Sequence, residues 1–377
     1  MRGSPLIRVD DYKEMRLKPE ALERYLSQVF GRGVSIRRLQ PLGVSVREED
    51  ALKAYGYGIP LRIDFELNGE ARSVVINTIK PGGFGHERRA DRAAILLWQA
   101  EAFNKLPRHV KALDIGAFTR DGEALSLSGC EEFFLLTDLV EGREYFHDLD
   151  GIRESGTLTK LDLERCRALA RYLAEIHSVK RDDPELYRRR IRELIGHSEC
   201  IFGLTDSYPE EAEYIRSEEL IDIEKRCIDW RWRLKHKTHR LSQVHGDFHP
   251  WNIIFRAGTD FTLLDRSRGE WGEPADDVSA MTINYLFYSL QRYGDLSGPF
   301  RELWETFYKV YLDETGDEEL LEVAQPFYCW RALVIASPVW YPTLSLKVRR
   351  GLLNFARNIL EVDVLNPWDI NPLLEEP

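Results

Sequence analysis

The stretch QVHGDFHPWNIIF, residues 243–255, is the most informative part of the chain because it places polar side chains between two apolar runs. Gly246 and Pro250 favour a turn here rather than a helix. Asp247 supplies a carboxylate, a group that acts as a general base or orients a hydroxyl for attack. Asn252 supplies a neutral amide oxygen, a hard ligand that suits Mg²⁺. The pattern therefore predicts a chemically active turn between two strands.

A second carboxylate ends the short apolar segment FTLLD, residues 261–265. Two adjacent strands joined as a hairpin would bring Asn252 and Asp265 side by side at their ends. A Mg²⁺ ion bound to nucleotide phosphates needs few protein oxygens, because phosphate and water supply the others. This spacing predicts a site for Mg²⁺ and a nucleotide.

Two other interpretations of the same stretch compete with this one. His245 and His249, together with Asp247, could bind a transition metal. Side chains four positions apart face one another on a helix, however, and the Gly and Pro argue against a helix. The second alternative is a polar turn without chemistry. We favour a structural role for His245, whose ring would hold the turn through backbone hydrogen bonds.

The composition of the 377 residues is that of a globular protein, with 43% apolar and 31% charged residues. The 52 Lys and Arg against 63 Asp and Glu give a net charge of −11, which argues against general binding to nucleic acid or anionic membranes. No apolar run approaches the ~18 to 20 residues of a membrane span, and no secretory signal is apparent. Five scattered cysteines without a CxxC pair favour buried thiols in a reducing cytoplasm.

Two regions of different character follow from the periodicity. In the first, alternating apolar residues and an NGE turn predict mostly antiparallel strands. The expected elements are a helix over 18–31, strands over 34–44, 59–69 and 71–80, a helix over 86–106, and strands within 110–122 and 131–142. From about residue 143, apolar positions spaced by three and four, as in 158–180, predict helices. We therefore expect an N-terminal lobe over 1–138 and a helical lobe over 139–377.

The lysine of VVINTIK, Lys80, is a candidate nucleotide contact in the first region. At the end of a strand it could contact phosphates as a point charge. Such a lysine needs an acidic partner. Glu87, Asp91 and Glu101 lie on one face of the expected helix that follows, and we favour Glu87 among them.

Other candidates rest on backbone groups. Gly56 and Gly58 would let backbone N–H groups approach phosphates closely, although glycines at this spacing are equally common in ordinary turns. The backbone around Thr137 and Leu139, between the two lobes, could meet an adenine edge. Asp277 precedes an apolar run and is expected to cap a helix at least as much as to serve chemistry.

With these residues in hand, the chain resembles the aminoglycoside phosphotransferase and choline kinase-like family, small-molecule kinases with the protein-kinase fold. The resemblance rests on VHGDFHPWNIIF, on LLDRSRGEWGEPADDVS and, more loosely, on VVINTIK, and it extends over roughly residues 34–290. It implies an α+β, bilobal protein-kinase-like fold. The small antiparallel N-lobe would contain one main helix, and the larger C-lobe would be mainly helical.

The resemblance also implies roles for individual residues. Asp247 matches the catalytic base, and Asn252 and Asp265 match the Mg²⁺ ligands. Lys80 matches the phosphate-binding lysine, and Asp277 the structural aspartate before the next helix. Arg266 departs from the family, which often has an aromatic residue there. The glycine loop is also longer than usual, which affects Gly56 and Gly58.

The implied function is ATP- and Mg²⁺-dependent transfer of a γ-phosphoryl group to a hydroxyl of a small molecule, such as an amino alcohol, a sugar or an aminoglycoside-like compound. The alternative is a catalytically silent, nucleotide-binding pseudokinase or scaffold on the same fold. Transfer to a protein is disfavoured, because the segment between Asp265 and Asp277 is short. Aromatic and acidic residues that could bind a cationic acceptor are Glu270, Trp271, Glu273, Trp330, Trp340 and Tyr341. The net charge also favours a neutral or cationic acceptor.

Overall fold

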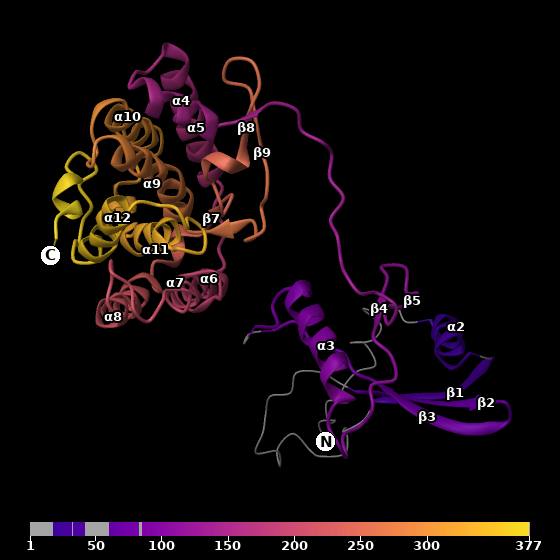
Figure 1. Cartoon of the computed structure of the whole chain (residues 1–377). Helices are drawn as coiled ribbons and strands as arrows, with labels where there is room; N and C mark the ends of the chain where they lie inside the picture. The colour runs from indigo at the N-terminus through magenta and orange to yellow at the C-terminus, as the bar shows by residue number, and fades with distance from the viewer. Residues whose placement is uncertain (1–17, 32, 42–59, 83–84, 377) are drawn as a thin grey trace, which may run out of the picture. The chain divides into compact units, whose positions relative to one another are not determined.

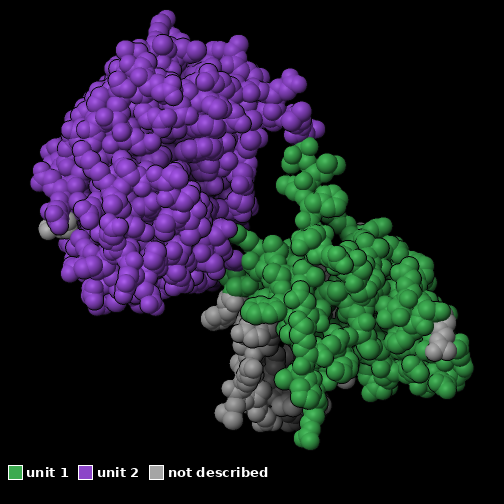
Figure 2. Space-filling view, in the orientation of Figure 1, with its two compact units in different colours: residues 1–137 green, residues 138–377 purple. Residues whose placement is uncertain are grey.

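The computed structural model describes residues 18–31, 33–41, 60–82 and 85–376. The chain divides into two compact units, residues 1–137 and 138–377 (Figures 1 and 2). Each unit has an apolar core of its own.

The first unit is built on a three-stranded antiparallel sheet in the order β1 (Val34–Pro41), β2 (Leu61–Leu67) and β3 (Glu70–Ile76). Asn68 and Gly69 join β2 to β3 with φ values of 52° and 83°, the left-handed conformation that a two-residue hairpin turn requires. The hairpin expected at NGE is confirmed.

A helix covers one face of this sheet. Strand β2 alternates between buried and half-buried residues, and its buried side chains include Ile63 and Phe65. Helix α2 (Pro19–Phe30) packs Leu22 and Leu26 against them. Helix α3 (Arg89–Phe103) and the hairpin of β4 (Gly116–Phe118) and β5 (Ala124–Ser126) complete the described part of this unit.

Strand β3 is shorter than the expected strand over 71–80. Its last residue, Ile76, pairs with Leu61, which is the first residue of β2, so no partner remains for the residues beyond it. Lys80, which is exposed, therefore lies in an irregular segment after the strand rather than at its end. Residues 42–44 of the first expected strand fall outside the described residues.

Two further expectations need correction. Helix α3 begins at Arg89, so Glu87 precedes the helix instead of lying on its face. The strand expected within 131–142 does not form, since residues 131–141 carry no helix or strand and no described strand pairs with them. The consecutive apolar residues of this segment lack the alternation of a half-buried strand.

The second unit is mainly helical (Figure 1). Its α-helices are α4 (Phe146–Ser155), α5 (Lys160–His177), α6 (Pro184–Gly196), α7 (Ile201–Thr205), α8 (Ser217–Leu234), α9 (Pro274–Arg292), α10 (Gly298–Thr315), α11 (Gln325–Ala336) and α12 (Leu346–Ile359). Short 3₁₀ helices cover Thr238–Arg240, Pro250–Asn252, Glu318–Glu322 and Asn371–Leu374. None of the helices in the described part of the chain is long and apolar enough to cross a membrane.

Helix α9 is the centre of this unit. Every residue from Pro274 to Leu290 is buried. Helices α4, α5, α10, α11 and α12 all contact α9, which Figure 1 shows among them. The surrounding core includes the fully buried indole rings of Trp230, Trp304 and Trp330. A helix enclosed on all sides gives a rigid support to whatever its polar residues hold.

Two small antiparallel sheets carry the loops of interest in this unit. Strands β6 (Arg143–Glu144), β8 (Ile253–Phe255) and β9 (Phe261–Leu263) form one sheet in the order β6-β8-β9. Strands β7 (Ser242–Gln243) and β10 (Trp271–Gly272) form the other.

Candidate functional site

The loop over residues 244–252 connects β7 of one small sheet to β8 of the other. It ends in a 3₁₀ turn over Pro250–Asn252, which leads directly into β8. Gly246 has a φ of +88°, and a Cβ added there would lie 3.2 Å from the Cβ of Arg268. The expected turn between two strands is therefore present, and glycine is required at its start.

Asp277 holds the beginning of this loop. Its buried carboxylate accepts hydrogen bonds from the backbone N–H groups of His245 and Gly246, both at 2.7 Å. His177 of α5 lies 3.2 Å from the same carboxylate and 2.8 Å from the hydroxyl of Tyr311. Burial acts to raise the pKa of Asp277, but the interactions with His177 and His245 outweigh it, so the pKa lies below its ordinary value.

The helix-capping role expected for Asp277 is wrong. The cap of α9 is Glu273, whose side chain accepts a hydrogen bond from Ala275 N, whereas Asp277 lies within the first turn. Its position on α9 places its carboxylate under the loop, where two backbone N–H groups need an acceptor.

The structural role predicted for His245 is confirmed. Its ring is buried, and Nδ1 accepts a hydrogen bond of 3.3 Å from the backbone N–H of Asp247. This contact tightens the turn locally. Among the described residues, no group of three His, Cys, Asp or Glu side chains is arranged to hold a metal ion, and the alternative of a histidine metal site gains no support.

The two carboxylate oxygens of Asp247 have different partners. Oδ1 accepts a hydrogen bond of 2.7 Å from Arg331 of α11, while Oδ2 lies 3.4 Å from His249 and 3.5 Å from the amide nitrogen of Asn252. Burial acts to raise the pKa of this carboxyl, but interactions with His249 and Arg331 outweigh it, and the pKa lies well below its ordinary value. The side chain is 14% exposed, so it remains within reach of a ligand.

Asn252 and Asp265 are brought together by the β8–β9 hairpin. The backbone N–H of Leu264 donates a 2.8 Å hydrogen bond to the carbonyl oxygen of Asn252, which continues the strand pairing up to Asp265. Asp265 is exposed and has a φ of +50°, a left-handed conformation rare outside glycine. Residues held this way concentrate at functional sites.

These two side chains suit a hard cation. The amide nitrogen of Asn252 donates to the carbonyl oxygen of Asp247 at 3.0 Å, which leaves the amide oxygen directed elsewhere. One oxygen of Asp265 accepts from Ser267 N at 3.1 Å, and the carboxylate can still offer its second oxygen. One amide and one carboxylate oxygen are a donor set that Mg²⁺ takes when phosphate and water complete its shell.

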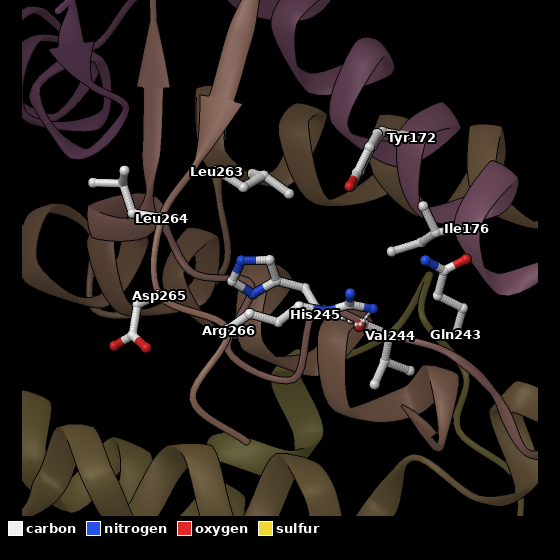
Figure 3. A pocket seen from close by; sticks show the side chains of 9 residues that line it. All are labelled: Tyr172, Ile176, Gln243, Val244, His245, Leu263, Leu264, Asp265 and Arg266. Atoms are coloured by element: carbon white, nitrogen blue, oxygen red, sulfur yellow. Dashed lines mark hydrogen bonds between the residues drawn. The ribbon is translucent and has the colours of Figure 1, made fainter. Parts of the chain in front are cut away.

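A cavity of about 190 Å³ lies beside the loop (Figure 3). Its lining residues are Tyr172, Ile176, Gln243, Val244, His245, Leu263, Leu264, Asp265 and Arg266. Arg266, which stands where the resembled family often has an aromatic residue, donates to the carbonyl oxygen of Val244 from Nε at 3.0 Å and from Nη2 at 2.7 Å. The carboxylate of Asp265 points away from the ring of His245 in this view.

Sequence reasoning missed the contacts of Arg331. This buried guanidinium also donates to Asp276 at 2.6 Å and to the carbonyl oxygen of Gly246 at 3.3 Å. Arg331 is the single charged residue of α11, whose sequence is QPFYCWRALVIA. A lone charge in an apolar helix was the available signal, since such a charge needs a buried partner.

The candidate nucleotide contacts of the N-terminal region do not belong to this loop or hairpin. Lys80 and Glu87 belong to the first unit, where Glu87 accepts a hydrogen bond from Gly85 N at 3.4 Å. Gly56 and Gly58 lie outside the described residues. Thr137 and Leu139 lie in the irregular segment at the boundary of the units, so they are not part of a strand.

An oriented carboxylate beside an amide and a second carboxylate, on a hairpin in a helical unit, defines a candidate site for phosphoryl transfer. The model of the "Phosphotransferase enzyme family" matches residues 79–318, which is more than half of the chain. The protein therefore belongs to this phosphotransferase family. The antiparallel strands of the first unit and the mainly helical second unit agree with the expected α+β class.

Solved structures similar to this chain include an ethanolamine kinase of Plasmodium vivax, with 15% identity, 79% of each chain covered and a TM-score of 0.38. An amicoumacin kinase in complex with AMP-PNP and Ca²⁺ has 15% identity and a TM-score of 0.42, with 96% of this chain and 99% of that chain covered. The gentamicin complex of APH(2")-IIa has 14% identity and a TM-score of 0.35, covering 93% and 98%. No curated protein matches the chain significantly.

Proposed function

We propose that this protein transfers the γ-phosphoryl group of ATP to a hydroxyl of a small molecule, with Mg²⁺ as cofactor. The observation that carries the proposal is the hairpin that brings Asn252 and Asp265 together beside Asp247. Membership of the phosphotransferase family supports the reaction class. The acceptor class follows from the resemblance: an amino alcohol, a sugar or an aminoglycoside-like compound.

Asp247 is the proposed catalytic base. Because its pKa lies well below the ordinary value, this carboxylate is ionised at neutral pH and is a weak proton acceptor. It would therefore act first by accepting a hydrogen bond from the acceptor hydroxyl and aiming that oxygen at the γ-phosphorus. The proton would pass to Asp247 late, once the new P–O bond has acidified the hydroxyl. This order suits the loose transition state of phosphoryl transfer.

Asn252 and Asp265 would hold the metal through the amide oxygen and the free carboxylate oxygen. When bound, Mg²⁺ neutralises the charge of the phosphates. Arg331 fixes Asp247 from the opposite side, so the base and the metal ligands keep a constant separation.

The nucleotide contacts of the N-terminal region belong to the proposal as well. Lys80 would contact the phosphates, with Glu87 as its acidic partner. Gly56 and Gly58 would offer backbone N–H groups to the phosphates, and the backbone at Thr137 and Leu139 would meet the adenine edge. We place the reaction in the cytoplasm, where the five unpaired cysteines stay reduced.

The test is acceptor-stimulated release of ADP from Mg·ATP, measured across amino alcohols, sugars and aminoglycosides. Asp247→Ala should lower kcat by about 10² to 10⁴ while ATP binding persists. Asn252→Ala should raise the Mg²⁺ concentration needed for half-maximal rate. Asp260→Asn, which removes a carboxylate from the exposed β8–β9 turn, is the matched control and should behave as the wild type.

Two results would contradict the proposal. One is a wild-type protein that binds no Mg·ATP. The other is Asp247→Ala with undiminished acceptor-dependent turnover. ATP binding without any turnover would support the alternative of a silent nucleotide-binding protein.

A further inference from the structure

Two guanidinium groups approach Asp247 from parts of the chain that are distant in sequence. Arg331 comes from α11 and Arg268 from the loop between β9 and β10. Arg331 is buried and donates to the carboxylates of both Asp247 and Asp276, while its buried Nε has no hydrogen-bond partner among the described residues. Its charge is neutralised within the fold, and it is not available to a ligand.

Arg268 differs from Arg331 in exposure and in its contacts. Its side chain is 20% exposed, and the nearest carboxylate oxygens belong to Glu199 at 3.7 Å and Asp247 at 3.9 Å. Both distances exceed the range of a good N–H···O hydrogen bond. Nη1 donates a long hydrogen bond of 3.7 Å to Cys200 Sγ, and among the described residues the buried Nε has no hydrogen-bond partner. The guanidinium is therefore held only weakly within the fold, and its exposed part can meet a ligand next to the candidate base.

The position of Arg268 is nevertheless well defined. Its guanidinium lies over the indole of Trp330, 4.5 Å from the ring centroid, and Trp330 is buried. Its Cβ lies close to Gly246 of the loop, where an added Cβ would be only 3.2 Å away. Stacking on an aromatic ring fixes the plane of a guanidinium and leaves its N–H edges free to bind two oxygens at once.

Arg268 and Asn252 lie at different oxygens of the Asp247 carboxylate. Arg268 approaches Oδ1 at 3.9 Å, whereas Asn252, the proposed metal ligand, lies 3.5 Å from Oδ2. An acceptor with a group bound to Arg268 would thus have its hydroxyl within reach of Asp247.

Three of the residues that could have bound a cationic acceptor, Glu273, Trp330 and Trp271, already contact arginines. Glu273 is buried and accepts hydrogen bonds from Arg240, the shortest at 2.7 Å, and from Tyr187 at 2.8 Å. The guanidinium of Arg268 stacks on Trp330. The guanidinium of Arg181 lies over Trp271, 5.5 Å from the ring centroid. The net charge of −11 thus does not describe the surroundings of Asp247.

We propose that the acceptor carries an anionic group, a carboxylate or a phosphate, which Arg268 binds while Asp247 orients the acceptor hydroxyl. The planar guanidinium matches both anions through paired hydrogen bonds. This inference rests on the proposed phosphoryl transfer and makes the acceptor a hydroxy acid or a phosphorylated alcohol, in place of the acceptor class that the resemblance suggests. Arg268 is then the residue that determines acceptor specificity.

The experiment compares acceptors that differ only by the anion: ethanolamine with serine, ethylene glycol with glycerate, and glycerol with glycerol 3-phosphate. Binding of each to the full chain with Mg·AMP-PNP is measured by ligand-observed NMR, and turnover with Mg·ATP by ADP release. The anionic member of at least one pair should be preferred about ten- to a hundredfold. The serine and glycerate pairs report a carboxylate, and the glycerol pair reports a phosphate.

Arg268→Gln should abolish this preference by raising the KM of the anionic acceptor, with little effect on its neutral counterpart. Arg268→Lys, which keeps the charge but loses the fork of donors, should retain part of the preference. Arg256→Gln removes an exposed arginine paired with Asp260 and should leave the preference intact. Thermal unfolding of each variant shows whether the fold is retained.

The inference is overturned if, in every pair, the wild type binds the uncharged or cationic acceptor as well as its anionic partner, or if no anion binds. It is also overturned if Arg268→Gln lowers kcat equally for all acceptors, because Arg268 would then contact the transferred phosphoryl group. The binding measurement does not depend on turnover. A protein that binds the anion yet never consumes ATP would contradict the proposed function and leave the anion site standing.

Discussion

At the scale of single residues, the chemistry of the site depends on how Asp247 is surrounded. The carboxylate is held between Arg331 on one side and His249 with Asn252 on the other. These partners favour the charged form more strongly than burial disfavours it. Asp247 is therefore a fixed anion, which suits its proposed role of positioning an acceptor hydroxyl.

The lowered pKa of Asp247 predicts a pH dependence of stability. A carboxyl whose pKa is lower in the folded than in the unfolded state stabilises the fold above its unfolded pKa of about 3.9. That contribution is lost as the pH falls through the folded pKa. Urea unfolding should show Asp247→Asn less stable than wild type by a constant amount above about pH 5, and by less below about pH 4. A difference that grows on acidification would contradict the assignment.

The buried ion pairs of Arg331 lead to a second prediction about a single residue. Arg331→Ala removes the counter-charge of the buried Asp276 carboxylate and the nearest cation of the partly buried Asp247 carboxylate. The free energy of unfolding should fall by about 3 to 5 kcal/mol, as when one partner of a buried ion pair is removed. Arg256→Ala removes an exposed partner instead and should cost at most about 1 kcal/mol. Equal losses in the two variants, measured by urea unfolding, would refute the role of Arg331.

The residues of the site were predictable to the extent that their contacts are local. Asn252 and Asp265 could be placed together from sequence because one hairpin connects them. Arg331 could not, because its contact with Asp247 spans 84 positions and arises from the packing of α11 against the loop. Arg268 was missed for the same reason, since its position depends on Trp330.

At the scale of elements, α9 supports the loop through one carboxylate. Asp277 binds two successive backbone N–H groups and contacts α5 through His177. Helix, loop and a second helix are thereby linked in the interior of the unit. The loop is therefore held in place by contacts with two helices, α9 and α5.

Asp277→Asn tests this link. The amide oxygen can accept from His245 N or Gly246 N, but the amide N–H₂ group then faces the other donor. One buried N–H is left unsatisfied, at a cost of about 1 to 3 kcal/mol in the free energy of unfolding. Amide hydrogen exchange at His245 and Gly246 should accelerate. Asp260→Asn, in an exposed turn, should change neither quantity.

Strands were predictable where an alternating segment has a neighbouring strand to pair with. The NGE hairpin formed because both of its strands alternate and the turn residues accept positive φ. The expected strand through Lys80 was too long, because β2 offers no residue to pair beyond Ile76. The apolar run within 131–142 has no alternation to specify a face, and it pairs with no described strand.

At the scale of the whole molecule, the chain consists of two units with separate cores (Figure 2). The larger core lies entirely within residues 145–370 and includes Trp304, Tyr308 and Tyr328. Asp247, Asn252 and Asp265 belong to the same unit. A unit with a complete core of its own is expected to fold alone.

A chain of residues 138–377 should therefore unfold cooperatively in urea, with a transition that also appears in the full-length protein. Trp304→Ala within this fragment should cost about 3 to 5 kcal/mol, as expected for a fully buried aromatic ring. Circular dichroism and tryptophan fluorescence would follow both transitions. A fragment that binds hydrophobic dyes and lacks a cooperative transition would show that the cores depend on one another.

Substitutions of the two arginines near Asp247 should have different consequences during evolution. Arg331 is embedded in a packed helix, so a substitution there disturbs the core and the base together. Arg268 stands on a short loop in which Ser267 and Glu270 are exposed. If Arg268 binds the acceptor as proposed, mutations at these positions would change the acceptor and leave Asp247, Asn252 and Asp265 in place. Descendants of this protein would then acquire new substrates through a few loop residues, without altering the residues proposed for phosphoryl transfer.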